Sequence, residues 1–361
     1  MLYHLLYPLR DVFFGFNLFG YITVRSALAA VTALLVTFLI GPGIIHWLKQ
    51  KGIGEEIRKD VPQSHQKKAG TPSMGGLVIL CAVLIPVVLF AKLDNLFIQL
   101  MIGVTLWMSC VGFLDDYLKI VKKYPKGLIG RYKLLGQIVM GLIVGVVITF
   151  STEYQGIHWS ISVPFFKNLM ISFGWLYIPM VIVVITGTSN AVNLTDGLDG
   201  LAIGLVGIAA LAWAGMSYVT GNVKFSEYLN IIYLSGAGEL TVYCGALIGS
   251  SLGFLWFNSH PASIFMGDTG ALALGGALGT LAVLLKKELL LLLVGGVFVA
   301  EALSVILQVV SFRWRRKRIF AMAPLHHHFE LKGWPEGQIV IRFWIIGIIL
   351  ALLSLGTFKV Q

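Results

Sequence analysis

Long uncharged apolar stretches recur along this sequence and restrict its fold more than any other feature. A helix needs about 20 mostly apolar residues to cross the hydrocarbon core of a bilayer. Only 12% of the 361 residues are charged, whereas ordinary soluble domains carry about 25%. The sequence therefore predicts an all-α polytopic membrane protein that forms a single domain over residues 1–361. Windows of spanning length predict about ten transmembrane helices, at roughly 22–48, 73–92, 96–118, 132–150, 172–190, 200–220, 238–257, 270–286, 289–312 and 338–358.

The basic residues indicate how these helices are oriented. Of the 27 lysines and arginines, 19 fall in the three regions 49–68, 119–133 and 313–342. Because cytoplasmic loops are enriched in lysine and arginine, these regions are predicted to be cytoplasmic and both termini periplasmic. The same placement argues against nucleic acid as a partner, although the net charge is +10. The segment 151–168 would then be periplasmic, and its short alternating stretches favour a small β-hairpin.

Six acidic residues lie at the ends of predicted spans or inside one. They are Asp115, Asp116, Asp196, Asp199, Asp268 and Glu301. Carboxylates at membrane depth are costly unless they are paired or hydrated, so residues of this kind are candidates for function. All of them except Glu301 are placed at ends that face the cytoplasm.

Asp115 and Asp116 are adjacent in the stretch VGFLDDYLK (111–119). Neighbouring residues of a helix project about 100° apart, so the two carboxylates cannot aim equally well at one point. We expect one of them to bind a metal or accept a proton while the other holds a lysine such as Lys119 at i+4. The alternative is a solvated helix end beside basic residues.

The stretch AVNLTDGLDG (191–200) places polar residues between two apolar runs. Spacing by threes would put four side chains on one side of a helix, and these are Asn190, Asn193, Asp196 and Asp199. Gly197 would let the backbone approach a ligand closely. The alternative, a capped turn between helices, explains one aspartate but not this density of polar groups.

Asp268 ends the stretch FNSHPASIFMGDTG, just before another predicted span. With Thr269 it could cap that helix, and it could also bind a metal, because the two roles are compatible.

Three consecutive histidines, His326, His327 and His328, lie in a loop that is predicted to be cytoplasmic. Imidazoles change charge near neutral pH. The run lacks the i, i+4 spacing of a helical zinc site, so phosphate binding or orientation is favoured over zinc. Lys68 precedes the glycine- and proline-rich turn of KKAGTPSMGG (67–76) and could contact phosphate as a mobile cation. The segment is not a Walker A loop.

Together these residues place carboxylates, lysines and histidines on the predicted cytoplasmic side. Carboxylates can hold Mg²⁺, which prefers oxygen ligands and often bridges substrate phosphates. Lysines and histidines can bind the remaining negative charge. The combination favours a phosphoryl-transfer site built from several loops at the membrane surface.

Five stretches together resemble the polyprenyl-phosphate N-acetylhexosamine-1-phosphate transferases: KKAGTPSMGG, FLDDYLK, NAVNLTDGLDGLA, FNSHPASIFMGDTG and MAPLHHHFE. The resemblance covers about residues 20 to 358, and the motifs come in the expected order and spacing. The KAGTPSMGG and HHHFE segments point to the members that use UDP-MurNAc-pentapeptide.

The resemblance implies ten helices with both termini in the periplasm. It also implies transfer of phospho-MurNAc-pentapeptide from its UDP carrier to undecaprenyl phosphate, which forms lipid I and UMP with Mg²⁺ present. This is a membrane step of peptidoglycan synthesis, at a site facing the cytoplasm across the bacterial inner membrane. A homodimer is compatible with the resemblance, which says nothing of regulatory partners.

Residue roles follow by motif match. Asp268 would be a metal ligand, and Asp115 and Asp116 would serve the acceptor phosphate and the metal. The uridine pocket would be lined by Asp196, Gly197, Leu198 and Asp199, with Phe265 stacked on the uracil. The site would also include Lys68, Asn190, Asn193, His326, His327 and His328.

The chemistry leaves two routes open. A lipid phosphate oxygen could attack the β-phosphate of the UDP-sugar directly, with Asp115 or Asp116 as an optional base. A carboxylate such as Asp268 could instead act as a nucleophile in two steps. We favour direct attack, because the second ionisation of the acceptor is near neutral pH.

The predicted span VFVAEALSVILQ (297–308) carries a polar stripe of Glu301, Ser304 and Gln308. We expect Gln308 to reach the nucleotide pocket and Glu301 to support it from deeper in the membrane.

Two alternatives remain at this stage. A related polyprenyl-phosphate GlcNAc-1-phosphate transferase would share most motifs but not HHHFE. A lipid transporter would explain the spans and Glu301, but not why acids, lysines and histidines gather on one side.

Overall fold

Helices make up nearly all of the regular structure in the computed structural model, which describes residues 1–52, 54, 70–124, 127–166 and 169–359. The α-helices are α1 (Leu2–Leu6), α2 (Ile22–Gln50), α3 (Gly76–Phe90), α4 (Leu96–Asp116), α5 (Gly130–Phe150), α6 (Tyr177–Thr195), α7 (Leu201–Thr220), α8 (Val223–Leu229), α9 (Leu240–Asn258), α10 (Gly267–Leu284), α11 (Leu291–Val294), α12 (Gly296–Arg315), α13 (Leu325–Leu331) and α14 (Glu336–Gly356). Within the described ranges, nine helical segments are long and apolar enough to cross a membrane, and α3 is a shorter apolar helix. The predicted all-α polytopic architecture is confirmed.

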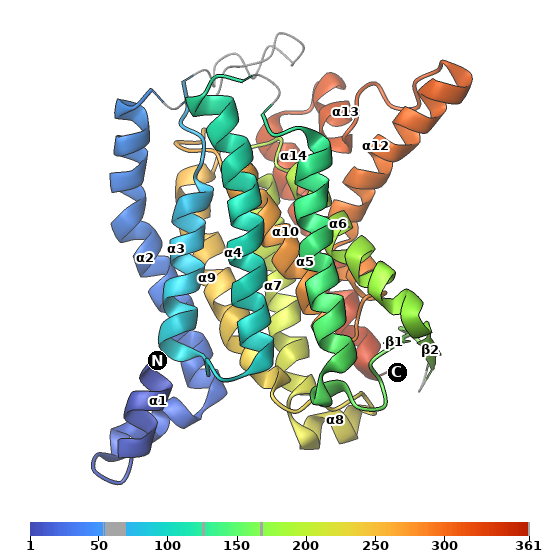
Figure 1. The fold of residues 1–361 in the computed structure, drawn as a ribbon. Coiled ribbons are helices and arrows are strands. Elements are labelled where there is room, and N and C mark those ends of the chain that lie inside the picture. Colours follow the sequence, from blue (N-terminus) through green and yellow to red (C-terminus); the bar gives the residue numbers. More distant parts are fainter. Residues whose placement is uncertain (53, 55–69, 125–126, 167–168, 360–361) are drawn as a thin grey trace.

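The helix α10 forms the centre of the bundle (Figure 1). Every residue from Thr269 to Leu284 is buried, and small residues let the neighbouring helices come close. A Cβ added to Gly275 would lie 2.6 Å from the carbonyl oxygen of Thr188 in α6. The glycines in 270–279 thus serve as close-packing positions.

The helix α3 is shorter than the predicted span 73–92 because the chain before it is bonded to the connection between α9 and α10. Phe265 N donates to Pro72 O at 2.8 Å, and Gly75 N donates to Phe265 O at 2.8 Å. These bonds hold the residues before Gly76 in an irregular conformation, so the helix begins at Gly76.

The predicted span 289–312 is present as a helix long enough to cross a membrane, but that helix begins only at Gly296. The chain forms the short helix α11, breaks at Gly295 and continues as α12. Paired glycines are a common cause of a sharp helix break, and Gly295 and Gly296 stand at this one. After the break α12 leans away from the bundle (Figure 1).

The predicted β-hairpin is present but lies further along the chain. Its strands β1 (Ser160–Ser162) and β2 (Met170–Ser172) pair antiparallel, with Ser160 opposite Ser172. The return strand falls outside the predicted segment 151–168. Val163 N, just after β1, still donates to Leu169 O at 3.0 Å, and Pro164, which cannot donate a backbone hydrogen bond, comes next in the chain.

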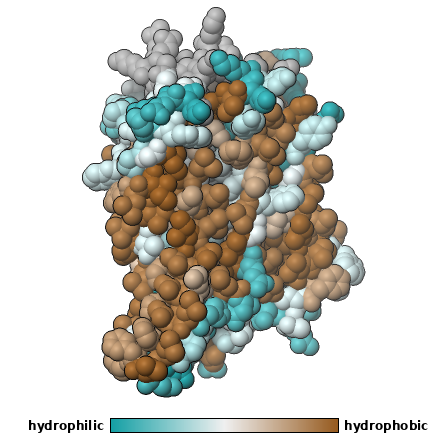
Figure 2. Space-filling model, turned by 60° about the vertical axis from the view of Figure 1, so that its left-hand side comes forward, coloured by the Kyte–Doolittle hydropathy of each residue, from teal (hydrophilic) through white to brown (hydrophobic). Residues whose placement is uncertain are grey.

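The surface is divided as expected for a membrane protein. Figure 2 shows apolar side chains over the middle of the molecule and hydrophilic ones gathered toward its two ends. Both termini lie in the lower half of Figure 1, away from α13 and the loop that follows α4. The chain is therefore a multi-pass membrane protein with both termini toward one end of the bundle, and the compartment that they face stays a prediction.

Candidate active site

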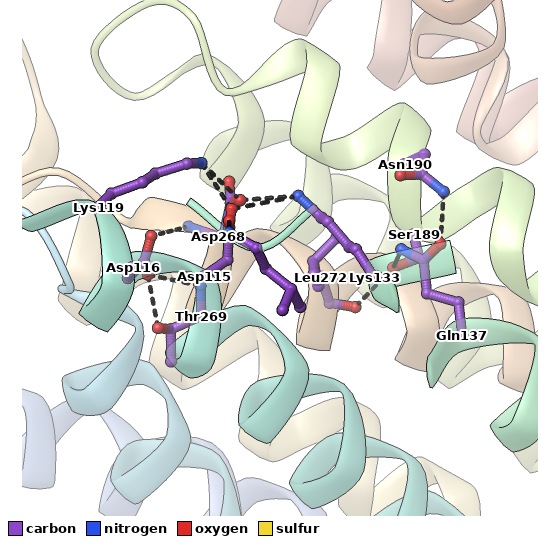
Figure 3. Close-up of polar contacts among 11 residues, drawn as sticks. Asp115, Asp116, Lys119, Lys133, Gln137, Ser189, Asn190, Asp268, Thr269 and Leu272 are labelled. Atoms are coloured by element: carbon purple, nitrogen blue, oxygen red, sulfur yellow. Dashed lines mark hydrogen bonds and ion pairs between the residues drawn. The ribbon is translucent and has the colours of Figure 1, made fainter. Parts of the chain in front are cut away.

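Asp268 lies where α4, α5 and α10 meet at one end of the bundle. Its Oδ2 atom accepts hydrogen bonds from Lys119 Nζ at 3.1 Å and Lys133 Nζ at 2.7 Å. Figure 3 shows the two lysines reaching Asp268 from two sides. Lys119 comes from the π-helical turn Tyr117–Val121 that continues α4, and Lys133 comes from the first turn of α5.

Asp115 belongs to the same group of charges. Its Oδ2 atom pairs with Lys119 and lies 3.7 Å from Lys133 Nζ, and its Oδ1 atom accepts from Leu128 N at 2.7 Å. The predicted i, i+4 contact between Asp115 and Lys119 is confirmed. We call Asp115, Lys119, Lys133 and Asp268 the Asp268 cluster.

Asp116 points in a different direction and caps α10 from outside that helix. Its Oδ1 atom accepts from Asp268 N at 3.1 Å. Its Oδ2 atom accepts from Thr269 N at 2.9 Å and from Thr269 Oγ1 at 2.6 Å (Figure 3). The adjacent aspartates therefore diverge, as expected. Asp268 and Thr269 do not cap their own helix, because they lie inside its first turn and Asp116 supplies the acceptor.

Burial makes these contacts stronger than surface ion pairs. The side chains of Asp115 and Asp268 are 3% and 13% exposed, and that of Lys133 is 15% exposed. Each carboxylate is matched by an ammonium group, and the N-terminus of α10 adds a favourable dipole for negative charge. The cluster offers carboxylate oxygens for a hard cation and ammonium groups for phosphate, which is the donor set expected for Mg²⁺ and a phosphorylated substrate.

The predicted common face of Asn190, Asn193, Asp196 and Asp199 is wrong. The helix α6 ends at Thr195, Asp196 has the non-helical angles φ −76° and ψ 52°, and Gly200 takes φ +79°. The chain leaves the helix there because Gly200 readily adopts the left-handed conformation that the turn into α7 requires.

Asn190 is used within the bundle. Its side-chain nitrogen donates to Gln137 Oε1 of α5 at 2.8 Å and to Thr186 O at 2.8 Å. Gln137 in turn contacts Ser189 Oγ at 3.3 Å (Figure 3). This network joins α5 to α6 beside the Asp268 cluster, while Asn193, one turn further along α6, is partly exposed.

Asp199 is buried and is tied to the connection between α9 and α10. Its Oδ2 atom lies 3.0 Å from His260 Nδ1 and accepts from Ala262 N at 3.1 Å. Its backbone nitrogen donates to Glu336 Oε1 at 2.8 Å. Leu198 beside it is 3% exposed.

The three histidines lie in the short helix α13. The sequence predicted a loop at this position, and that part of the prediction is wrong. His326 is fully buried and packs against Gly197, where an added Cβ would collide with its Nε2 atom. Burial lowers the pKa of His326, and the nearby Glu301 carboxylate opposes that shift only in part. His327 Nδ1 lies 2.7 Å from Glu330 Oε2, and His328 Nδ1 accepts from Ala321 N at 3.1 Å.

The polar stripe of α12 supports this helix. Glu301 Oε1 accepts from His326 N at 3.2 Å. Gln308 Oε1 accepts from the backbone nitrogens of Ile319 and Phe320, each at 3.0 Å, and its Nε2 donates to Phe320 O at 3.0 Å. Gln308 thus holds the loop that leads to α13, and direct contact with a nucleotide stays a prediction.

Phe265 is bonded through its backbone to the irregular segment before α3, and its side chain is partly exposed. The end of the KKAGTPSMGG motif and the FMGDTG motif therefore meet. Lys68 lies outside the described residues. The roles predicted for all the site residues stay predictions, although most of those described gather at this end of the bundle.

Some residues of this region were missed by the sequence argument: Lys133, Gln137, His260 and Glu336. Lys133 was counted only among the basic residues of 119–133. Its position at the start of a predicted span was a usable signal, but nothing in the sequence relates it to Asp268.

Comparisons with known proteins show which family the chain resembles. The model of the family "Glycosyl transferase family 4" matches residues 98–286, and the "Phospho-N-acetylmuramoyl-pentapeptide-transferase signature 1" matches residues 68–80. Proteins named phospho-N-acetylmuramoyl-pentapeptide-transferase from Thermodesulfovibrio yellowstonii and Citrifermentans bemidjiense are each 53% identical to this chain. One from Desulfotalea psychrophila is 52% identical. Each match covers 100% of both proteins.

Proposed function

Because this chain belongs to the phospho-N-acetylmuramoyl-pentapeptide-transferase family, we propose that the Asp268 cluster is where it transfers phospho-MurNAc-pentapeptide from UDP to undecaprenyl phosphate. The products are lipid I and UMP. The observation that carries the proposal is the contact of two lysines with one oxygen of Asp268 at a junction of three helices. A soluble UDP-sugar and a lipid phosphate could both reach such a position at the end of a membrane bundle.

The reaction exchanges one phosphorus–oxygen bond for another. An oxygen of the lipid phosphate attacks the β-phosphorus of the UDP-sugar, and the bond between that phosphorus and UMP breaks. Both reactants are anionic, so the barrier contains a large repulsive contribution. Lys119 and Lys133 are positioned by Asp115 and Asp268, and their charges would stabilise the transferring group and the departing UMP.

The residues present fit a divalent metal. Asp268 and Asp115 offer buried carboxylate oxygens at the end of the bundle, and Mg²⁺ prefers oxygen ligands together with substrate phosphates. When bound, Mg²⁺ would neutralise phosphate charge. Asp116 is placed to hold the first turn of α10, which carries Asp268, in a fixed position.

A strong base is not required, because the acceptor phosphate is largely ionised near neutral pH. Asp115, which belongs to the Asp268 cluster, would take any remaining proton, because both oxygens of Asp116 already accept hydrogen bonds from the first turn of α10. We favour direct attack over a covalent intermediate on Asp268, because two lysine ammonium groups contact that carboxylate and reduce its nucleophilic character.

We place the site on the cytoplasmic face of the bacterial inner membrane. The loop after α4 and the segment before α13 are at the same end of the bundle as the Asp268 cluster (Figure 1). Both belong to the lysine- and arginine-rich regions of the sequence, and such regions favour the cytoplasm.

The test is release of UMP by the detergent-purified protein, supplied with UDP-MurNAc-pentapeptide and undecaprenyl phosphate, with and without Mg²⁺. We expect release that needs both the lipid and Mg²⁺ and that is lost in a folded Asp268→Asn variant. UDP-GlcNAc in place of the first substrate should give no release. Turnover with UDP-GlcNAc alone, or full activity in Asp268→Asn protein, would contradict the proposal.

A further inference from the structure

Two carboxylates and one imidazole from three separate elements converge outside the Asp268 cluster. Asp199 comes from the connection between α6 and α7, His260 from the connection between α9 and α10, and Glu336 from the first residue of α14. One ligand atom from each lies within 4.8 Å of the other two. We propose that this trio, which we call the His260 site, binds a divalent transition-metal ion such as Zn²⁺.

The separations match those of ligands on one ion. Ligand atoms about 2.1 Å from a metal lie about 3.0 Å apart at right angles and about 3.4 Å apart at tetrahedral angles. His260 Nδ1 lies 3.0 Å from Asp199 Oδ2 and 3.4 Å from Glu336 Oε2. Little movement of the side chains would therefore be needed to receive an ion.

Backbone groups already orient both carboxylates. Ala262 N donates to Asp199 Oδ2 at 3.1 Å, and Asp199 N donates to Glu336 Oε1 at 2.8 Å. Hydrogen bonds of this kind fix the direction of metal ligands and are a regular part of metal sites. The bond from Asp199 N uses Oε1 of Glu336 and leaves its Oε2 atom facing His260.

The two carboxylates of the His260 site are buried and its imidazole is exposed, so a metal ion could reach the site from solvent. The side chains of Asp199 and Glu336 are 2% and 8% exposed, whereas that of His260 is 49% exposed. Two buried carboxylates concentrate negative charge, and the imidazole edge faces solvent. An ion could enter from that side and keep one position for water.

The donor set indicates the class of metal. An imidazole nitrogen with two carboxylate oxygens suits Zn²⁺ and other first-row divalent ions. Mg²⁺ favours oxygen ligands alone, so it should prefer the Asp268 cluster. An ion here would join two interhelical connections to α14 and so fix the turn that contains Asp196, Gly197 and Leu198.

The experiment measures metal binding in the absence of substrates, so its result does not depend on the proposed function. Full-length protein without a polyhistidine tag is purified in detergent, treated with a chelator and titrated with Co²⁺ and Zn²⁺. The visible absorption of Co²⁺ reports the coordination geometry of the bound ion, and elemental analysis after gel filtration gives the Zn²⁺ content. We expect about one ion per chain, with affinity lowered about tenfold or more by His260→Gln and by Glu336→Gln.

Two control variants separate this site from others. His46→Gln removes an exposed histidine outside the trio, and Asp268→Asn removes the central carboxylate of the Asp268 cluster. Both should bind Co²⁺ as the unchanged protein does. The proposal is overturned if no ion is retained, if Asp268→Asn abolishes binding, or if binding survives both His260→Gln and Glu336→Gln. In those cases the trio is only an ion-paired hydrogen-bond cluster.

Discussion

Lys133 makes the closer of the two lysine contacts with Asp268, 2.7 Å against 3.1 Å for Lys119. Its side chain is 15% exposed and that of Lys119 is 35% exposed. A charge in a drier position interacts more strongly with a developing negative charge. Lys133 should therefore contribute more to the transition state than the other basic residues of 119–133.

We predict that Lys133→Ala lowers kcat about 10²- to 10³-fold, as loss of an electrostatic stabiliser does. The measurement is the rate of UMP release at saturating substrates. Arg131→Ala is the matched control, because Arg131 lies two positions away, is exposed and packs over Tyr132. Equal losses in the two variants would mean that the loop needs only positive charge, and the specific contact with Asp268 would have no role.

At this scale the sequence revealed local contacts and missed distant ones. The pairing of Asp115 with Lys119 follows from helical spacing, because the two residues are four positions apart. The pairing of Asp268 with Lys133 spans 135 positions, and no periodicity relates the two. The same limit explains why Asp199 was expected on the face of a helix, whereas it lies against His260.

Helix α4 positions Asp268 through a glycine. A Cβ added to Gly112 would collide with the carbonyl oxygen of Asp268 and lie 2.7 Å from Thr269 Cα. The first turn of α10 can therefore rest on α4 only because residue 112 has no side chain.

We predict that Gly112→Ala lowers kcat about 10²-fold, the cost of a small misplacement of a catalytic group. The control is Gly103→Ala in the same helix, where an added Cβ would meet only Met140 Cε at 3.9 Å. Alanine is the better helix former by about 1 kcal/mol at both positions, so only the packing differs. Comparable activity in the two variants would show that α10 tolerates displacement.

Gln308 connects α12 to the segment before α13 through three backbone contacts of its amide. Gln308→Ala should loosen this loop and raise KM for the UDP-sugar about tenfold, equivalent to about 1.4 kcal/mol, with KM for the lipid unchanged. Gln155→Ala, at an exposed position near the β-hairpin, is the control. An unchanged KM in Gln308→Ala would remove both the positioning role and the predicted nucleotide contact.

The bounds of helices could be predicted where the length of an apolar stretch determines them. They could not be predicted where a glycine or proline interrupts a helix or strand. Most spans were placed within a few residues. The predicted span 289–312 starts too early, because apolar length alone does not reveal the break at Gly295. The hairpin was placed too early in the chain, because Pro164 stands between its two strands and β2 begins only at Met170.

Across the whole molecule, the charged residues gather toward opposite ends of the bundle. The family could be predicted from the motifs, whereas the orientation inferred from the basic loops stays a prediction. The end away from Asp268 holds a second set of buried charges that no motif indicated, namely Lys286, Lys287 and Glu288. Lys286 donates to His158 O at 2.7 Å, and Tyr177 donates to Glu288 Oε1 at 2.8 Å.

These charges make stability depend on pH. Burial raises the pKa of Glu288 to about 7 from 4.5, against the opposing effect of Lys286. Burial lowers the pKa of Lys286 and of Lys287 to about 8 each, with Glu288 opposing. The folded state thus binds the Glu288 proton more tightly than the unfolded state. The stability from that proton is fully present below pH 4.5 and is lost as pH rises through about 7.

We predict that Glu288→Gln protein gains stability relative to the unchanged protein as pH rises from about 5 to about 7, by on the order of 3 kcal/mol for the full shift. Within that window both lysines stay protonated, because their lowered pKa values are still about 8. The measurement is the apparent Tm of detergent-purified protein at several pH values. Glu153→Gln, at an exposed position near the hairpin, should run parallel to the unchanged protein. If the Tm curve of Glu288→Gln protein is also parallel to that of the unchanged protein, Glu288 is hydrated and ionised in the folded state. Its burial would then have no effect on how the stability of the protein depends on pH.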